Sequence, residues 1–502
     1  MLAIRSGHIL TLDEKDQFFS NGDLLIGDSS IEYVGPRLEH VPEDATILDA
    51  SGKLVMPGLV NVHAHTNEIL NRGRFENVYL ETWGLHAYPP ADYGPFSPRL
   101  IYLRTMLAAI EMLRGGVTSI QDDVAEVPRL TMEGTSAVRQ AYVDSGMRAS
   151  VACNQINRRH FEQYPFLRDR LPPAALNLLM ASTPPSVEQI LSTYREIVDR
   201  WHDAAGGRLR VTLSFAAPQR CTPEYMLGLL RLANECDLPL HMHILETKIQ
   251  RVNSQDLFGK SLAQYVGDLG LLSPRATVIH SIWVDAADIA LLGEAGVNVA
   301  HCPVANLKLG AGLMPLRPLV DAGVTVGLGT DGASSNDSMS LFETMKLAAI
   351  LHKNSGRDPA EWPTAREVLG MATANGARSM LLDSKIGRLA PGFKADIILL
   401  DTETPSFTPF NDPVKQLVYC ENGSSVDTVI VDGRIIMRGG VFEQIDAKGV
   451  IREFREMRMA CDEQFERARK VSDELFLPTY REYAGERLSH DVPMSRWFTD
   501  RG

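Results

Sequence analysis

The chain lacks paired cysteines. It has six cysteines and no C-x-x-C pair among them: Cys153, Cys221, Cys236, Cys302, Cys420 and Cys461. These spacings exclude a cysteine-rich zinc site, and they indicate reduced thiols rather than a disulfide framework. Reduced thiols are typical of a cytosolic enzyme, so we expect a cytoplasmic location.

Long apolar runs and an excess of basic residues are also missing. No stretch approaches the ~20 apolar residues of a transmembrane helix, and MLAIRSGHILTLDEKDQ contains no signal-like apolar segment. The formal net charge of -13 argues against nucleic acid as the main partner, because phosphate contacts require clustered Lys and Arg. We expect neither a membrane nor a nucleic acid partner.

Short β segments, separated by Gly and Asp, are predicted near both ends of the chain. They occur within residues 1–55 and again in ADIILLDTE (395–403) and VDTVIVDGRIIMRGG (426–440). We expect one small β-sandwich domain built from residues 1–55 and 389–445. Residues 446–502 are charged and helix-prone, which favours a helical tail packed on the protein surface or on another subunit.

Residues 56–388 alternate predicted helices and strands, the pattern of a parallel sheet. A helix is predicted over 98–116, ending at Gly115-Gly116, and another over 222–237, with Thr222 as its N-cap. Apolar strands are predicted at 117–123, 209–218, 238–246, 277–284, 297–303 and 324–332. A (β/α)8 barrel of about 250 residues fits this length, and a doubly wound sheet is the alternative.

Histidines and carboxylates stand at the ends of four predicted strands. They are His63 and His65 in PGLVNVHAHTNE, His241, His243 and Glu246 in LPLHMHILE, His280 in VIHS, and Asp331 in GLGTDG. In a barrel, the C-terminal ends of the strands converge on the face where active sites form. A buried imidazole without a partner is unfavourable, so this repeated placement indicates a common site.

Sequence motifs along most of the chain support this interpretation. They are PGLVNVHAHT, AAIEMLRGGVTS, HMHILET, VIHSIWV, AHCPVANLKLGAG, GLGTDGASSND, MATANGARSM, IGRLAPGFKADIILLD and VDTVIVDGRIIMRGG. In these motifs and in their order, roughly residues 1–440 resemble the amidohydrolase superfamily. The similar branch includes S-adenosylhomocysteine and methylthioadenosine deaminases and s-triazine hydrolases. Such relatives are often dimers or tetramers, so the resemblance implies a homo-oligomer.

The resemblance also implies a metal site. It makes four residues the ligands of one divalent metal: His63, His65, His243 and Asp331. Zinc is the expected ion, with iron or manganese as alternatives. Glu246 would carry a proton from the metal-bound water to the leaving nitrogen, and His280 would polarise that water. Binuclear relatives carry a bridging Lys after the strand at 209–218; no Lys occurs here, which favours a single metal.

Three other histidines are expected to have no ligand role. His241 shares a strand face with His243 but does not match the family's ligand position, so we expect a buried structural histidine. His301, in AHCPVAN, is expected to be structural as well. His86, in WGLHAYPP, is expected to be an ordinary loop residue.

The substrate pocket is expected to involve four residues: Trp83, Gln219, Gly332 and Ser335. Trp83 has an aromatic face that can stack on a planar heterocycle. Adenosine-type deaminases of this branch usually carry a G-P-H-A-P-like segment whose His contacts the substrate. Here FAAPQRCTPE places Ala216 at that position, which weakens the case for a nucleoside substrate.

The resulting hypothesis is a metal-dependent hydrolase of a C–N bond other than a peptide bond. It would deaminate a small amino-substituted N-heterocycle by means of metal-bound hydroxide. Dechlorination of an s-triazine and hydrolysis of an amide or carbamate are alternatives that use the same nucleophile. A non-catalytic barrel used for binding is a hypothesis of another class, and the intact set of ligands with Glu246 and His280 argues against it.

Overall fold

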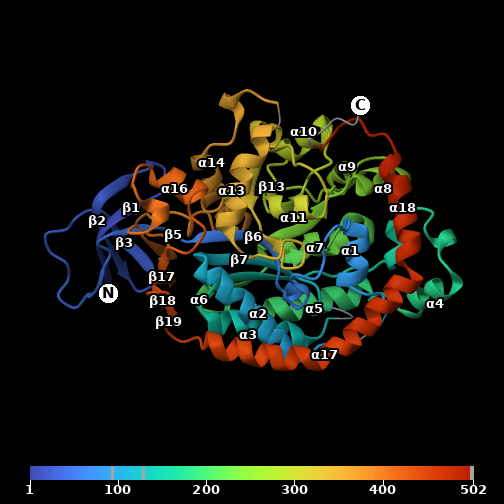
Figure 1. Cartoon of the computed structure of the whole chain (residues 1–502), viewed down its shortest axis with the longest axis horizontal. Helices are drawn as coiled ribbons and strands as arrows, with labels where there is room; N and C mark the ends of the chain where they lie inside the picture. Colours follow the sequence, from blue (N-terminus) through green and yellow to red (C-terminus); the bar gives the residue numbers. More distant parts are fainter. Residues whose placement is uncertain (92–94, 127–129, 355, 498–502) are drawn as a thin grey trace.

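Parallel strands surrounded by helices fill the larger part of the molecule, and a mixed sheet lies at one end (Figure 1). The computed structural model describes residues 1–91, 95–126, 130–354 and 356–497. The last part of the predicted tail, residues 498–502, therefore lies outside the described residues.

The central strands form two five-stranded parallel sheets, β15-β6-β7-β8-β9 and β10-β11-β12-β13-β14. The strands are β6 (Leu59–His65), β7 (Val117–Val124), β8 (Arg148–Cys153), β9 (Leu209–Val211), β10 (Leu213–Ser214), β11 (Leu240–Ile244), β12 (Ala276–His280), β13 (Asn298–His301), β14 (Thr325–Leu328) and β15 (Asp331–Gly332). Only Thr212 separates β9 from β10, and only Gly329 and Thr330 separate β14 from β15. The two sheets are therefore continuous at both edges and close into the predicted (β/α)8 barrel, which excludes the doubly wound alternative.

Helices follow the barrel strands and cover their outer side (Figure 1). They include α2 (Pro98–Arg114), α3 (Met132–Ser145), α5 (Val187–Trp201), α7 (Pro223–Cys236), α8 (Lys248–Phe258), α10 (Ala286–Glu294), α13 (Leu341–Leu351) and α14 (Ala365–Met371). The predicted helix boundaries are confirmed for two of them. Helix α2 ends at Arg114 with Gly115 as its C-cap, and the Thr222 side chain caps α7 by accepting a hydrogen bond from the Tyr225 backbone N–H.

Several barrel strands end earlier than predicted. The strands predicted at 209–218, 238–246 and 277–284 end at Ser214, Ile244 and His280. Non-glycine residues with positive φ interrupt the extended backbone there: Ala216 (φ 57), Leu245 (φ 51), His280 (φ 70) and Ser281 (φ 48), with Asp331 (φ 62) at the start of β15. Each such residue costs about 1–2 kcal/mol. This strain is concentrated at the end of the barrel where the predicted site residues lie.

Segments from both ends of the chain share one nine-stranded mixed sheet, in the order β19-β18-β17-β16-β5-β1-β2-β3, with β4 paired to β1. The strands are β1 (Leu2–Leu10), β2 (Phe18–Gly27), β3 (Ser30–Pro36), β4 (Thr46–Asp49), β5 (Lys53–Pro57), β16 (Ile397–Asp401), β17 (Val426–Val431), β18 (Arg434–Arg438) and β19 (Val441–Phe442). The two segments meet where β5 pairs antiparallel with β16. They also share one core, to which Ile4, Leu24, Ile397 and Ile430 belong.

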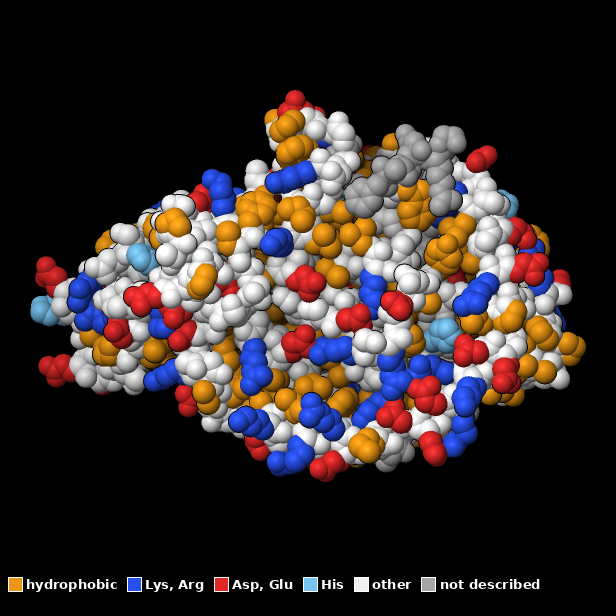
Figure 2. Space-filling view, in the orientation of Figure 1, with side chains coloured by type: hydrophobic (Ala, Val, Ile, Leu, Met, Phe, Trp, Pro, Cys, Tyr) orange, Lys and Arg blue, Asp and Glu red, His pale blue; other side chains and the backbone are white. Residues whose placement is uncertain are grey.

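Two helices form the tail, α17 (Ala447–Leu475) and α18 (Leu477–Ser489). Helix α17 runs along the lower edge in Figure 1, where it contacts α2, and α18 rises beside α1 (Leu80–Ala87) and α8. Charged side chains of both signs intermingle along this lower edge (Figure 2). Within the described residues, every helix is too short or too polar to cross a membrane.

Candidate active site

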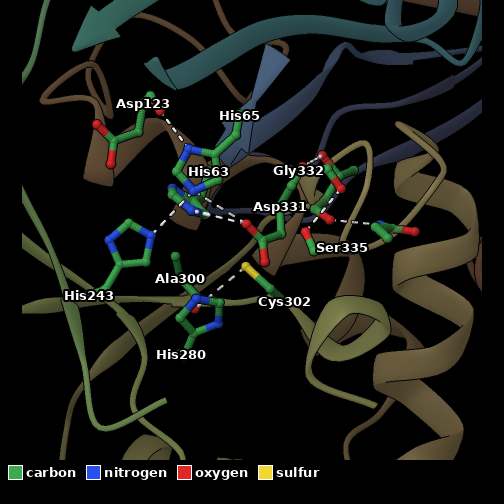
Figure 3. Close-up of polar contacts among 12 residues, drawn as sticks. His63, His65, Asp123, His243, His280, Ala300, Cys302, Asp331, Gly332 and Ser335 are labelled. Carbon is green, nitrogen blue, oxygen red and sulfur yellow. Dashed lines mark hydrogen bonds and ion pairs between the residues drawn. The ribbon is translucent and has the colours of Figure 1, made fainter. Parts of the chain in front are cut away.

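The ends of β6, β11 and β15 bring three imidazoles and a carboxylate together inside the barrel (Figure 3). The Asp331 Oδ1 atom lies 3.4 Å from His63 Nε2 and 3.5 Å from His65 Nε2. The Nε2 atoms of His65 and His243 are 3.3 Å apart. The four residues predicted as metal ligands thus form one cluster at the end of the barrel where the strands terminate.

Hydrogen bonds at Nδ1 fix the orientation of two of these imidazole rings. His65 Nδ1 donates to the Asp123 carbonyl oxygen at 2.5 Å, and His243 Nδ1 donates to the Ala216 carbonyl oxygen at 2.8 Å. A carbonyl oxygen can only accept, so Nδ1 carries a hydrogen in both rings and Nε2 faces the cluster. Both ring nitrogens of buried His63 lack a hydrogen bond within the described residues.

The electrostatics of the cluster favour a cation. The Nε2 atoms of His65 and His243 face each other, so a proton on His65 or a metal ion must lie between them. Burial lowers the pKa of His63 to about 4 and that of His243 well below its ordinary value. Burial also opposes the charging of His65, but the carboxylates of Glu68, Asp331 and Asp123 outweigh it and raise its pKa to about 9. Three imidazoles and a carboxylate in such a field are suited to a divalent metal.

Asp123 is a second carboxylate beside the same imidazoles. Its side chain groups with His63, His65 and His243 as a possible ligand set, in addition to the set that contains Asp331. Asp331 is in ion-pair contact with two of these rings, whereas the Asp123 carboxylate makes no such contact among the described residues. Asp123 Oδ2 instead accepts a hydrogen bond from Asn154 at 2.9 Å. The Asp122-Asp123 pair at the end of β7 was the sequence signal for this residue.

Glu246 and His280 stand next to the cluster. Glu246 Oε1 lies 3.6 Å from His280 Nε2, and His280 Nδ1 donates to Asn306 Oδ1 at 2.9 Å. Burial, and then the nearby carboxylates of Asp331 and Glu81, raise the pKa of Glu246 well above its ordinary value. A raised pKa makes this carboxylate a stronger base toward a water molecule, which suits a group that accepts a proton and passes it on.

A cavity of about 210 Å³ opens beside these residues, and Trp83, Gln219 and Ser335 line it together with Ala216. Within the described residues, neither Trp83 Nε1 nor Gln219 Oε1 has a hydrogen-bond partner, although both side chains are buried. A buried polar atom without a partner is unfavourable. Both residues line the cavity with polar atoms that the protein leaves unpaired.

Gly332, which is predicted to shape the pocket, lies against Glu68. A Cβ at Gly332 would lie 1.8 Å from Glu68 Oε2, so only glycine leaves room for this carboxylate. Glu68 lines the cavity; its Oε1 accepts from the Tyr88 hydroxyl at 3.0 Å, and its Oε2 accepts from Ser334 Oγ at 2.8 Å. Glu68 is not among the pocket residues predicted from the sequence, although it is the third residue after His65 in HAHTNE.

The three histidines without an expected ligand role lie outside the cluster. Within the described residues, both ring nitrogens of buried His241 lack a hydrogen-bond partner. His301 Nε2 is 3.3 Å from His352 Nε2. His86 belongs to α1 rather than to a loop, and its Nε2 is 2.7 Å from Asp473 of α17.

Comparisons with known proteins agree with this geometry. Residues 54–436 match the Amidohydrolase family. The chain is 34% identical over 452 residues to the 5'-deoxyadenosine deaminase of Methanosarcina mazei, which covers 90% of this chain and 96% of that relative. It is 35% identical over 439 residues to the 5-methylthioadenosine/S-adenosylhomocysteine deaminase of Symbiobacterium thermophilum, covering 87% and 93%.

A solved structure of atrazine chlorohydrolase from Arthrobacter aurescens, complexed with zinc, has a TM-score of 0.81 and 25% identity to this chain. The similarity covers 91% of this chain and 100% of that one. The family match spans most of the chain, and the relatives cover nearly all of it at more than 30% identity. The chain belongs to the amidohydrolase family.

Proposed function

We propose that the protein hydrolyses a carbon–nitrogen bond in a small amino-substituted N-heterocycle and releases ammonia. The observation that carries this proposal is that Glu246 and His280 line one cavity together with His65, His243 and Asp331 of the cluster. The deaminases among its relatives support the same reaction.

We further propose that His63, His65, His243 and Asp331 hold one zinc ion. The convergence of three imidazole Nε2 atoms and the Asp331 carboxylate supports a resident cation. The zinc bound in the similar chlorohydrolase structure supports zinc in particular. When bound, a zinc ion would lower the pKa of a water molecule toward ~7 and supply a nucleophile near neutral pH.

In the proposed reaction, water adds to the ring carbon that bears the amino group. Glu246 takes a proton from the attacking water and delivers it to the amino nitrogen, so that ammonia leaves and the carbon retains the oxygen. His280 accepts a hydrogen bond from the attacking water at Nε2 and so polarises it, and its hydrogen bond to Asn306 keeps Nε2 directed toward the reaction. The raised pKa of Glu246 supports its part in this proton transfer.

An aminated purine is the substrate class that we propose. The two relatives described above are named for adenosine derivatives, which carry an amino group on a purine ring. Trp83, an aromatic residue that can stack on such a ring, and Gln219, a polar one, both line the cavity. Ala216 supplies no side-chain contact of the kind expected for nucleoside deaminases, so this chain would use other groups for that purpose.

A substrate panel tests the proposal. The zinc-loaded protein would be incubated with 5'-deoxyadenosine, 5-methylthioadenosine, free aminopurines, aminopyrimidines and atrazine, and ammonia and chloride would be measured. We expect ammonia from at least one aminopurine compound. Chloride release from atrazine without ammonia from any amine would replace deamination by dechlorination as the function.

A further inference from the structure

Helix α18 packs against the wall of the cavity. Its residues Leu477, Tyr480, Tyr483 and Ala484 are buried in one cluster with Phe161 and other apolar side chains of the segment that follows β8. Figure 1 shows α18 standing beside α1 and α8, two helices that also contribute residues to the cavity. The tail is therefore more than a helix on the outer surface.

Two tyrosines of α18 hydrogen-bond to residues that line the cavity. The Tyr480 hydroxyl is 2.8 Å from His160 Nδ1, and the Tyr483 hydroxyl donates to Asn253 Oδ1 at 2.9 Å. Tyr164, which also lines the cavity, packs edge-on against both tyrosine rings, with centroid distances of 5.4 Å and 5.7 Å. Contacts from α18 thus fix the positions of three cavity residues.

These cavity residues are separate from the reacting groups. Among the described residues, neither His160 nor Asn253 forms a hydrogen bond or ion pair with a member of the histidine and aspartate cluster. The same wall contains Arg220, which has no carboxylate partner within the described part of the chain. Polar groups that the protein leaves unused can serve the part of a substrate that does not react.

We propose that Tyr480 and Tyr483 are positioning residues, which hold His160 and Asn253 so that this wall binds the substituent carried by the heterocycle. This inference rests on the proposed function. For a purine nucleoside, the substituent is the sugar with its 5' group. The C-terminal helix would then contribute to substrate specificity, although its own side chains act through the cavity residues that they contact.

The experiment compares Tyr480→Phe with the wild-type protein on the preferred compound of the panel. The change removes one hydroxyl and keeps the ring that packs in the apolar cluster. We expect KM to rise about three- to twelvefold, within the usual range for one hydrogen bond, while kcat stays within about twofold. Tyr102→Phe is the matched control, because its hydroxyl donates to Asp144 between α2 and α3, away from the cavity, and it should change neither constant.

A double-mutant cycle with His160→Asn tests whether Tyr480 acts through His160. We expect Tyr480→Phe to have little further effect in the His160→Asn background. Additive effects of the two changes, or an unchanged KM in Tyr480→Phe, would overturn the inference while leaving deamination intact.

Binding provides a readout that does not depend on turnover. Calorimetry with 5'-deoxyadenosine on Glu246→Gln protein, with and without Tyr480→Phe, should show a matching loss of affinity. Equal affinities would contradict the role of α18. Absence of ammonia release from every compound would instead refute the proposed function, and absence of binding by the whole panel would overturn both.

Discussion

At the scale of single residues, the atoms behind the imidazoles determine what the site can bind. His65, His243 and His280 each direct Nδ1 to an oxygen atom and present Nε2 to the interior. Because the oxygens belong to the backbone or to a buried amide, the rings cannot rotate without losing a hydrogen bond. Such preorganisation favours rapid metal capture and a fixed position for the reacting groups.

Glu246→Gln tests the proton transfer. The amide retains the size of the carboxyl group but cannot carry a proton between water and amine, so kcat should fall about 10²–10⁴-fold. Bound metal, measured by elemental analysis, should be unchanged. Glu235→Gln, on the exposed side of α7, is the control and should retain full activity. A fully active Glu246→Gln protein would contradict the assigned role.

Gly332→Ala tests the contact between this glycine and Glu68. The new methyl group would meet Glu68 Oε2 at 1.8 Å and must displace this carboxylate from the cavity wall. We expect kcat/KM to fall at least about tenfold, since small displacements in a site have large kinetic effects. Gly370→Ala in α14 adds the same methyl group where nothing lies within 4 Å and should have no kinetic effect.

At the scale of elements, hydrophobic periodicity and capping residues predicted which segments form helices and strands. The N-cap of α7 at Thr222 and the C-cap of α2 at Gly115 could be predicted from the sequence, because capping depends on local residues. The strand ends could not be predicted, since Leu245 has no intrinsic preference for positive φ. Its backbone is held by tertiary contacts, in which the Leu245 carbonyl accepts from the N–H groups of Ile282 and Trp283.

In the site, too, residues whose positions depend on tertiary contacts could not be predicted from the sequence. His63, His65, His243 and Asp331 could be placed together because strand ends in a barrel converge. Glu68 could not, because its role depends on the loop that brings Ser334 and Gly332 against it. The contact of Tyr480 with His160 joins residues far apart in the sequence, and no local pattern indicates it.

A buried ion pair joins the barrel to the mixed sheet. Arg148 of β8 contacts Asp396 with two hydrogen bonds, of 2.6 Å and 3.0 Å, and both side chains are only 3% and 2% exposed. Removing one partner leaves a buried charge uncompensated. Arg148→Met should therefore lower the free energy of unfolding by about 3–5 kcal/mol in chemical denaturation.

The exposed pair of Arg195 and Glu235 supplies the control for that prediction. These side chains are 55% and 51% exposed at a distance of 3.0 Å. Arg195→Met should change stability by less than about 1 kcal/mol. Equal effects of the two substitutions would show that the Arg148 pair does not hold the two parts together.

At the scale of the whole molecule, segments from both ends of the chain pack against the barrel. The N-terminal strands and the strands after residue 396 form one sheet at one end, and the tail helices extend to the cavity at the other. A metal that binds only the folded barrel should stabilise the whole unit. Chelation should thus lower the melting temperature, and added zinc should restore it; an unchanged melting temperature would argue against a resident ion.

Zinc titration of the chelated protein tests whether one bound metal ion per chain is required for activity. Ammonia release from the preferred aminopurine compound would be measured against the zinc bound per chain. We expect no activity without metal, a linear rise with bound zinc, and saturation at about one zinc per chain. Full activity in the metal-free protein, or saturation only at two ions per chain, would contradict a single ion held by His63, His65, His243 and Asp331.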